Sequence, residues 1–369
     1  IIKILVLLTK KNTFGFISIS NIFKNKDFAI ASELIKVDDQ LLINSFEKNF
    51  AKLIGSGYVK SYSAGRMGFH ELMKTLKIGN EDEIIVNSGN CAVMINAILD
   101  IGAKPIYSDV DLDTFGSCPI EIEKKISQKT KMIVAQHSFG IPCKIDAIKE
   151  IADKHKIFLL EDCALTLESR FKKIKVGNYG NASLFSFDHT KPLNGFSGGA
   201  IYTNEKLLYE KLQSSHQFIG NLSKKKQKAM LKRHSLEQKL IRSNNYKQLI
   251  IFDLINSVRK WLGFISPYLN ENTGINNFDC SYPYPSKMPS FTANILSKNI
   301  NKSWDKLKEL RKKNLKKLIG ELKPTKLGDY IPQVYFDRNS QIVPLRLILY
   351  KKKSNNDLKK MFSSLIKTD

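Results

Sequence analysis

Two side chains that could do chemistry follow apolar runs of the sequence. Asp162 comes after the run 157–160, where its carboxylate could hold a protonated ring nitrogen. Lys191 follows the run 182–187 among small and hydroxyl residues, a position suited to a lysine that forms a Schiff base. His137 ends an earlier apolar run. Each also has an ordinary interpretation, because Asp often caps helices, Lys is abundant here and a lone His is commonly structural.

A phosphate site is indicated where Ser63-Ala64-Gly65-Arg66 opens a predicted helix. Glycine at a helix N-terminus leaves backbone N–H groups aimed at one point, which suits a phosphate. Glycines open many helices, so this signal gains weight only from Asp162 and Lys191 further along the chain.

The elements that must position these residues alternate between strands and helices from about residue 41 to 215. Continuous apolar strands separated by amphipathic helices predict an α/β fold, with a mostly parallel sheet covered by helices on both faces. In such sheets, chemistry collects just past the carboxyl ends of the strands. The predicted strands are 84–86, 104–107, 132–135, 157–160, 182–187 and 199–203, and the predicted helices are 42–53, 65–76, 92–99, 120–126 and 145–155.

The rest of the chain is organised differently. Residues 221–266 are first Lys-rich and then apolar, which indicates an amphipathic helix that packs on its own protein or lies on an anionic membrane surface. Prolines mark 283–289 as a linker, before a predicted helix 291–322 and a predicted strand 342–350.

We therefore divide the chain into four parts. They are an N-terminal segment 1–40, a large domain 41–220, a basic and amphipathic helical insert 221–282, and a smaller α+β C-terminal domain 283–369. The chain begins with Ile rather than Met, which leaves open whether its N-terminus is complete. Whether the C-terminal domain is truncated is left open as well.

Composition narrows the class of protein. With 369 residues, 42% hydrophobic and 25% charged, the chain is typical of a globular protein rather than a disordered one. The net charge of +24 comes mainly from Lys spread along the chain, whereas Arg, the usual reader of bases, is scarce. We expect no nucleic-acid partner, and an anionic substrate fits this charge. Five cysteines without a CxxC pair favour a reducing, cytoplasmic location and no metal site.

Taken in chain order, these features resemble the DegT/DnrJ/StrS family of sugar aminotransferases, fold-type-I enzymes that use pyridoxal phosphate. The resemblance covers about 41–215 and is loose after 280. It rests on Ser45-Phe46-Glu47, Ala64-Gly65-Arg66-Met67, Glu81 to Val86, Gly102-Ala103-Lys104-Pro105, Asp109-Val110-Asp111, Val134 to Gly140, Glu161-Asp162-Cys163-Ala164, Ser186 to Lys191, and Gly198-Gly199-Ala200.

The resemblance implies a role for each candidate residue. Lys191 would form the Schiff base with pyridoxal 5'-phosphate and then act as acid and base in the proton shift. Asp162 would pair with the pyridinium nitrogen, which keeps the ring an electron sink. Ser186 and the backbone at Gly65 and Arg66 would hold the cofactor phosphate.

Other positions are similar to the family only in part. His137 would lie close to the cofactor ring. Cys91 stands where the family usually stacks an aromatic side chain on the ring, and Leu165 stands where a Gln usually contacts the ring hydroxyl. Arg66 replaces the usual Thr and could offer the phosphate a guanidinium.

We therefore expect a transaminase that moves an amino group, from an amino-acid donor such as glutamate, to a nucleotide-linked keto-sugar, acting as a homodimer. A dehydratase is an alternative, but its relatives carry His where this chain has Lys191. Cys91 and Leu165 favour a further alternative, a binding or regulatory protein that keeps the fold. The basic insert keeps open a polyanion- or membrane-surface-binding protein.

Overall fold

A central sheet organises the computed structural model, which describes residues 25–37, 39–240, 254–255, 257–259, 261–269, 272–274 and 277–350. In the described chain this sheet has nine strands, in the order β10-β13-β1-β9-β8-β5-β4-β2-β3. β1, β8, β5, β4, β2 and β3 run in one direction, and β9, β13 and β10 run in the other. The strands are β1 Tyr58–Tyr62, β2 Glu83–Asn87, β3 Lys104–Ser108, β4 Thr130–Gln136, β5 Phe158–Asp162, β8 Ala182–Ser186, β9 Gly199–Thr203, β10 Gly220–Asn221 and β13 Ser286–Lys287.

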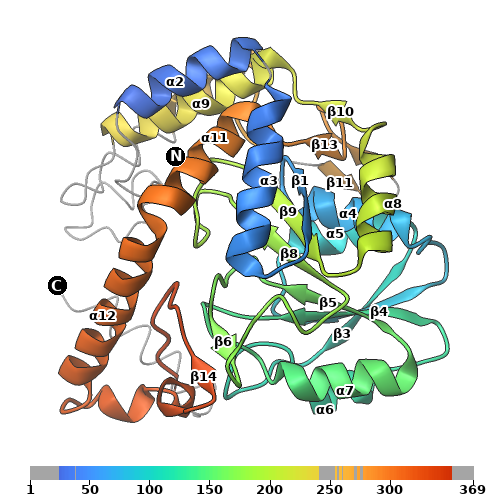
Figure 1. Ribbon diagram of the computed structural model, residues 1–369, viewed down its shortest axis with the longest axis vertical. Coiled ribbons are helices and arrows are strands. Elements are labelled where there is room, and N and C mark those ends of the chain that lie inside the picture. Colours follow the sequence, from blue (N-terminus) through green and yellow to red (C-terminus); the bar gives the residue numbers. More distant parts are fainter. Residues whose placement is uncertain are drawn as a thin grey trace.

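Helices cover both faces of this sheet (Figure 1). One face packs against α4 Gly65–Thr75, α5 Ala92–Asp100 and α8 Lys206–His216. The other packs against α3 Gln40–Ile54, α6 Pro119–Glu123, α7 Ile145–His155 and α11 Ser290–Lys302. The predicted mostly parallel, helix-covered sheet is confirmed.

Smaller elements complete the described chain. α2 Asn25–Val37 and α9 Lys224–Leu240 lie side by side across the top of Figure 1. α12 Trp304–Leu322 extends away from the sheet along one side. The remaining elements are β6 Arg170–Phe171, β7 Ile174–Lys175, β11 Asn272–Gly274, β12 Asn277–Asp279, β14 Ser340–Gln341 and the 3-10 helices η1 Gly328–Tyr330 and η2 Gln333–Phe336.

The alternation predicted for 41–215 is confirmed, and the apolar periodicity explains it. α3 begins where the Asp39 side chain accepts a hydrogen bond from Leu41 N at 2.9 Å, which caps the helix. It buries Phe46 and Phe50, which contact the edges and faces of Phe185 and Phe187. This aromatic cluster fixes α3 against the strand that precedes Lys191.

The predictions for the C-terminal region were wrong in three places. The predicted linker contains β13, which pairs with β1 and β10 in the central sheet. The predicted helix 291–322 is interrupted at Ser303, between α11 and α12. The predicted strand 342–350 does not form, because its N–H groups bond to loops instead: Val343 N to Ser169 Oγ at 2.9 Å and Leu345 N to Phe139 O at 2.9 Å.

The insert is helical in its basic part. α9 packs against α2, so this part of the insert docks on its own protein. Part of the predicted apolar helix 249–265 lies outside the described residues. Within the described part, 254–255, 257–259 and Trp261 are helical, and Trp261 and Leu262 are exposed. Among the described residues, no helix is long and apolar enough to cross a bilayer.

Candidate active site

A cavity of about 450 Å³ lies where the carboxyl ends of β4, β5 and β8 meet the first turns of α4 and α5. This is the edge of the sheet where parallel strands collect chemistry. Six residues from the sequence prediction, together with Leu165, line it: Gly65, Arg66, Cys91, Asp162, Ser186 and Lys191. The chain thus brings together side chains that are up to 126 positions apart (191 − 65 = 126).

The first turn of α4 forms one wall of the cavity. Ala64 precedes the helix in extended conformation and supplies no capping side chain, so the opening N–H groups are not capped by it. A Cβ on Gly199 would lie 2.2 Å from Gly65 N, and one on Gly65 would lie 3.1 Å from Phe185 O. Glycine is therefore required for α4 to start against the ends of β8 and β9, beside Ser186.

Arg66 does not extend freely into this wall. Its Nη2 donates a hydrogen bond to Leu269 O, within the insert 221–282. The guanidinium predicted as a phosphate ligand is thus engaged in tying residues 267–269 to α4.

Asp162 ends β5 with its side chain on the cavity side. It is buried, and Oδ1 accepts the Ala164 N–H at 2.9 Å. Burial raises the pKa of Asp162, and the Ala164 hydrogen bond and the charge of Lys191 offset this only in part. Within the described chain no ion pair reaches this carboxyl group. A cation bound beside it, such as a protonated ring nitrogen, would stabilise its charged form.

Lys191 lies in the turn after β8, and its N–H donates to Asp188 O at 3.0 Å. In the same turn, His189 Nδ1 is 2.6 Å from Asp188 Oδ1, and both side chains line the cavity. Burial alone would raise the pKa of Asp188, but the His189 hydrogen bond and charge lower it to about 2. This turn therefore places an ionised carboxylate three residues, and an imidazole two residues, before Lys191.

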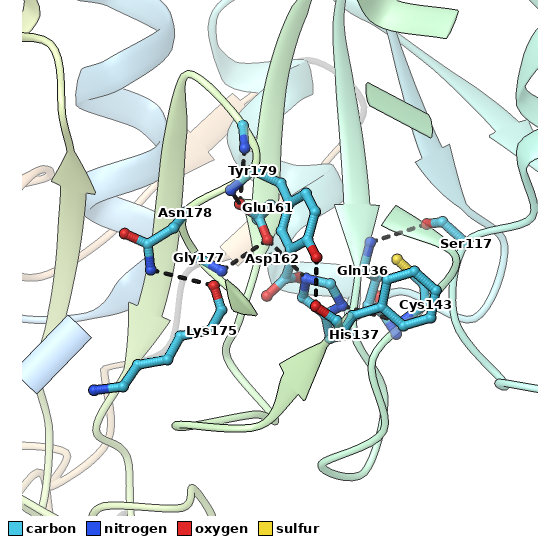
Figure 2. A network of polar contacts seen from close by, with 12 residues as sticks. Ser117, Gln136, His137, Cys143, Glu161, Asp162, Lys175, Gly177, Asn178 and Tyr179 are labelled. Carbon is cyan, nitrogen blue, oxygen red and sulfur yellow. Dashed lines mark hydrogen bonds and ion pairs between the residues drawn. The ribbon is translucent and has the colours of Figure 1, made fainter. Parts of the chain in front are cut away.

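His137 is the predicted site residue that does not reach the cavity. Gln136 pairs with Asp162 in register and lines the cavity, whereas Ala135 pairs with Glu161. Side chains alternate along a strand, so Gln136 and Asp162 face one side of the sheet, whereas their neighbours His137 and Glu161 face the other. His137 is fully buried on that other side, beside Glu161 (Figure 2).

Glu161 is the centre of the network in Figure 2. Oε1 accepts the N–H groups of Tyr179 at 2.6 Å and Gly180 at 2.8 Å. Oε2 accepts the Gly177 N–H at 2.7 Å and lies 3.1 Å from His137 Nε2. The carboxylate therefore holds the loop 177–180 against the strand end that carries Asp162.

The same network includes a group of metal-ligand type. Ligand atoms of His137, Glu161 and Cys163 lie within 4.8 Å of one another. Cys143 N donates to His137 Nδ1 at 3.1 Å, so the ring proton is on Nε2, which donates to Glu161. Both ring nitrogens are thereby used, and the arrangement is satisfied as a hydrogen-bond network.

Sequence reasoning missed several residues that line the cavity. Asp188 and His189 lie within the segment Ser186 to Lys191 that led to the prediction of Lys191. Their closeness to Lys191 in the sequence could therefore have indicated that they line the same cavity. Arg233 and His234 come from α9, and Tyr268 comes from a later part of the insert. The insert was predicted to pack on its own protein or to contact an anionic partner, and nothing in its Lys-rich pattern indicated which of its side chains turn inward.

Comparisons with known proteins identify a family whose sequence pattern this chain matches. The family model described as the DegT/DnrJ/EryC1/StrS aminotransferase family matches residues 37–367. The chain is similar to GDP-perosamine synthase of Escherichia coli O157:H7, 37% identical over 169 residues, which cover 46% of each protein. The matched part thus spans about half the length of that curated relative.

Two solved structures share the fold. An aminotransferase from Psychrobacter cryohalolentis is 21% identical with a TM-score of 0.65, covering 94% of this chain and 81% of that one. An E. coli GDP-4-keto-6-deoxy-D-mannose-3-dehydratase with bound hydrated PLP is 16% identical with a TM-score of 0.65, covering 96% and 84%. The family model spans nearly the whole sequence, and on this ground the chain belongs to the DegT/DnrJ/EryC1/StrS aminotransferase family.

Proposed function

We propose that this protein is a pyridoxal-phosphate-dependent transaminase that aminates a nucleotide-linked keto-sugar, with an amino acid such as glutamate as donor. One observation carries the proposal: Lys191, the buried carboxyl of Asp162 and the glycine-bounded start of α4 at Gly65 line a single cavity. Membership of the family and the likeness to a GDP-perosamine synthase support the substrate class.

The residues of the cavity fit the cofactor. Bound pyridoxal phosphate supplies an electron sink for chemistry at an amine carbon. Asp162 is suited to hold the protonated ring nitrogen, since no ion pair among the described residues occupies its carboxylate. The opening N–H groups at Gly65 and the Ser186 hydroxyl would hold the phosphate. Lys191 would carry the reacting amine and move the proton on Nζ.

At two positions the residues around the proposed cofactor site differ from those usual in the family. Cys91 precedes α5 on the cavity wall, where a ring-stacking aromatic side chain would be larger. Leu165 offers no hydrogen bond to a ring hydroxyl. Gln136, in register with Asp162, is a lining residue whose amide could supply that polar contact instead.

The test begins with the cofactor. The purified protein, mixed with pyridoxal phosphate, is expected to develop the visible absorbance band of a lysine-bound cofactor. Borohydride reduction followed by peptide mapping should place the label on Lys191. Incubation with a panel of nucleotide-linked keto-sugars and glutamate, followed by mass measurement, then identifies an aminated product. A label on another lysine would contradict the site assignment.

A second candidate function is a protein that keeps the fold as a binding or regulatory module, and Cys91 and Leu165 favour it. That protein would take up no cofactor or would give no product with any sugar in the panel. A dehydratase would instead release water from the sugar without consuming glutamate, so glutamate measured in the same assay separates the two enzymes.

We further propose that the protein acts as a cytoplasmic homodimer. The described cysteines are free, which fits a reducing compartment, and the family forms its site across a dimer. Light scattering during gel filtration should give twice the chain mass, and a monomer at micromolar concentration would contradict the dimer. Binding of the apolar residues around Trp261 to anionic vesicles, lost in high salt, would add membrane contact.

A further inference from the structure

The inward face of α9 carries basic and polar side chains among its apolar ones. Lys226 and His234 are buried and Arg233 is nearly so, whereas Lys232 is exposed. A helix that only covers a core buries an apolar stripe, because burying charged groups costs free energy unless they are paired. α9 therefore turns charge inward, and it does so where it borders the cavity.

Arg233 has donors that the described residues leave without a hydrogen bond. Its side chain is 10% exposed and lines the cavity, with the guanidinium 4.3 Å from the centre of the Tyr268 ring. Within the described part of the chain Nε has no hydrogen-bond partner, and Nη2 is 3.7 Å from Glu237 Oε2, which is too far for a hydrogen bond. Glu237 itself does not line the cavity. A buried, unpaired donor is costly, and an acceptor entering the cavity would offset that cost.

His234 adds a second open group one residue further along. It is 2% exposed, stacks on Phe196 with ring centres 4.6 Å apart, and also lines the cavity. Its Nδ1 lies 3.7 Å from Glu237 Oε2, too far for a hydrogen bond, and has no hydrogen-bond partner among the described residues. Burial lowers the pKa of His234, so the ring enters the cavity wall as a neutral imidazole that can donate one N–H.

The segment 267–269 holds these groups at the cavity. Lys226 Nζ donates to Tyr268 O at 2.6 Å, and Arg66 Nη2 donates to Leu269 O. The segment is thus tied to α9 on one side and to the first turn of α4 on the other. It keeps the Tyr268 ring under the Arg233 guanidinium and makes the insert a wall of the candidate active site.

We propose, building on the proposed function, that Arg233 and His234 bind the diphosphate group of the nucleotide-linked substrate. An arginine fork with an additional imidazole N–H matches an anion with many oxygens. The carboxylate of the amino-acid donor shares this chemistry. A diphosphate is favoured because it has more acceptor oxygens than one carboxylate, and two neighbouring side chains offer it open donors. The strongly positive chain would also attract the more highly charged anion.

The test measures binding directly, with cofactor-loaded protein in a calorimeter. Inorganic pyrophosphate, GDP, dTDP and UDP are titrated in one arm and glutamate in another. The variants are Arg233→Met, the conservative Arg233→Lys, and Lys232→Met as a matched control that removes one exposed charge from the neighbouring position. The visible cofactor band reports separately on the site around Lys191.

We expect Arg233→Met to weaken diphosphate binding roughly 10- to 100-fold, the effect of losing hydrogen bonds to a charged group. Arg233→Lys should lose part of the affinity and Lys232→Met less than about twofold. Unchanged diphosphate affinity in both Arg233 variants would overturn the proposal, as would a loss confined to glutamate. Absence of the cofactor band from the wild type, with diphosphate binding intact, would instead refute the proposed function and leave this binding site standing.

Discussion

Replacing Glu161 by Gln is expected to destabilise the protein strongly, although the side chain keeps its shape. Each carboxylate oxygen accepts two donors: Tyr179 and Gly180 N–H groups at Oε1, and Gly177 N–H and His137 at Oε2. In either orientation of the amide, the new NH₂ group faces two of these donors. Each buried donor without an acceptor costs roughly 1 to 3 kcal/mol, so the expected loss is about 2 to 6 kcal/mol.

Urea unfolding followed by circular dichroism measures this loss, provided that the slope with denaturant is unchanged. Glu210→Gln is the matched control, because that carboxylate is exposed and lies 3.7 Å from Lys206. It should change the free energy of unfolding by at most about 0.5 kcal/mol. If Glu161→Gln were as stable as Glu210→Gln, the loop 177–180 would be held by something other than this carboxylate, and the argument would fail.

Three further predictions concern single side chains. Lys191→Ala should abolish the visible band of bound cofactor without loss of the folded circular dichroism spectrum, because the side chain borders a cavity rather than the core. Asp162→Asn should lower turnover by orders of magnitude while some cofactor stays bound, and near-full activity would contradict its role. The pKa of His216 is lowered to about 3 by burial and by the Lys60 charge, so the folded state keeps this ring neutral. Its stabilisation is complete above the unfolded pKa of about 6.5 and declines as pH falls toward 3, by about 2 kcal/mol at pH 5. His216→Gln should remove that part of the acid destabilisation, whereas the exposed control His155→Gln should not.

Much of the fold could be predicted because its signals are local. Apolar runs and amphipathic stretches between 41 and 215 each specify one strand or helix, and the alternation fixes a parallel sheet. The C-terminal region failed for the opposite reason. Ser286 and Lys287 look like a proline-rich linker, yet they form β13 because β1 offers them an edge. Residues 342–350 look like a strand, yet in the described structure they form none and loops take hydrogen bonds from their N–H groups.

Site residues could be predicted from the sequence where they lie at the end of a strand or at a glycine that begins a helix. Asp162, Ser186 and Gly65 are fixed by the sheet edge, and their convergence follows from the topology. Arg233 and His234 could not be found in this way. Which face of α9 turns inward depends on its packing against α2 and on the segment 267–269, and these are contacts between residues far apart in the sequence.

The end of β5 carries two adjacent carboxylates, one that stabilises the fold and one that faces the cavity. Glu161 and Asp162 are adjacent and both are buried, but the alternation of the strand sends them to opposite faces of the sheet. Glu161 meets three backbone N–H groups and a histidine, so its charge is fully used in holding the loop 177–180. Asp162 meets one N–H and a cavity. Glu161, whose oxygens are fully hydrogen-bonded, thus holds the strand end in place, while the carboxylate of Asp162 remains accessible to a ligand. The same alternation explains why Gln136 lines the cavity where His137 was expected.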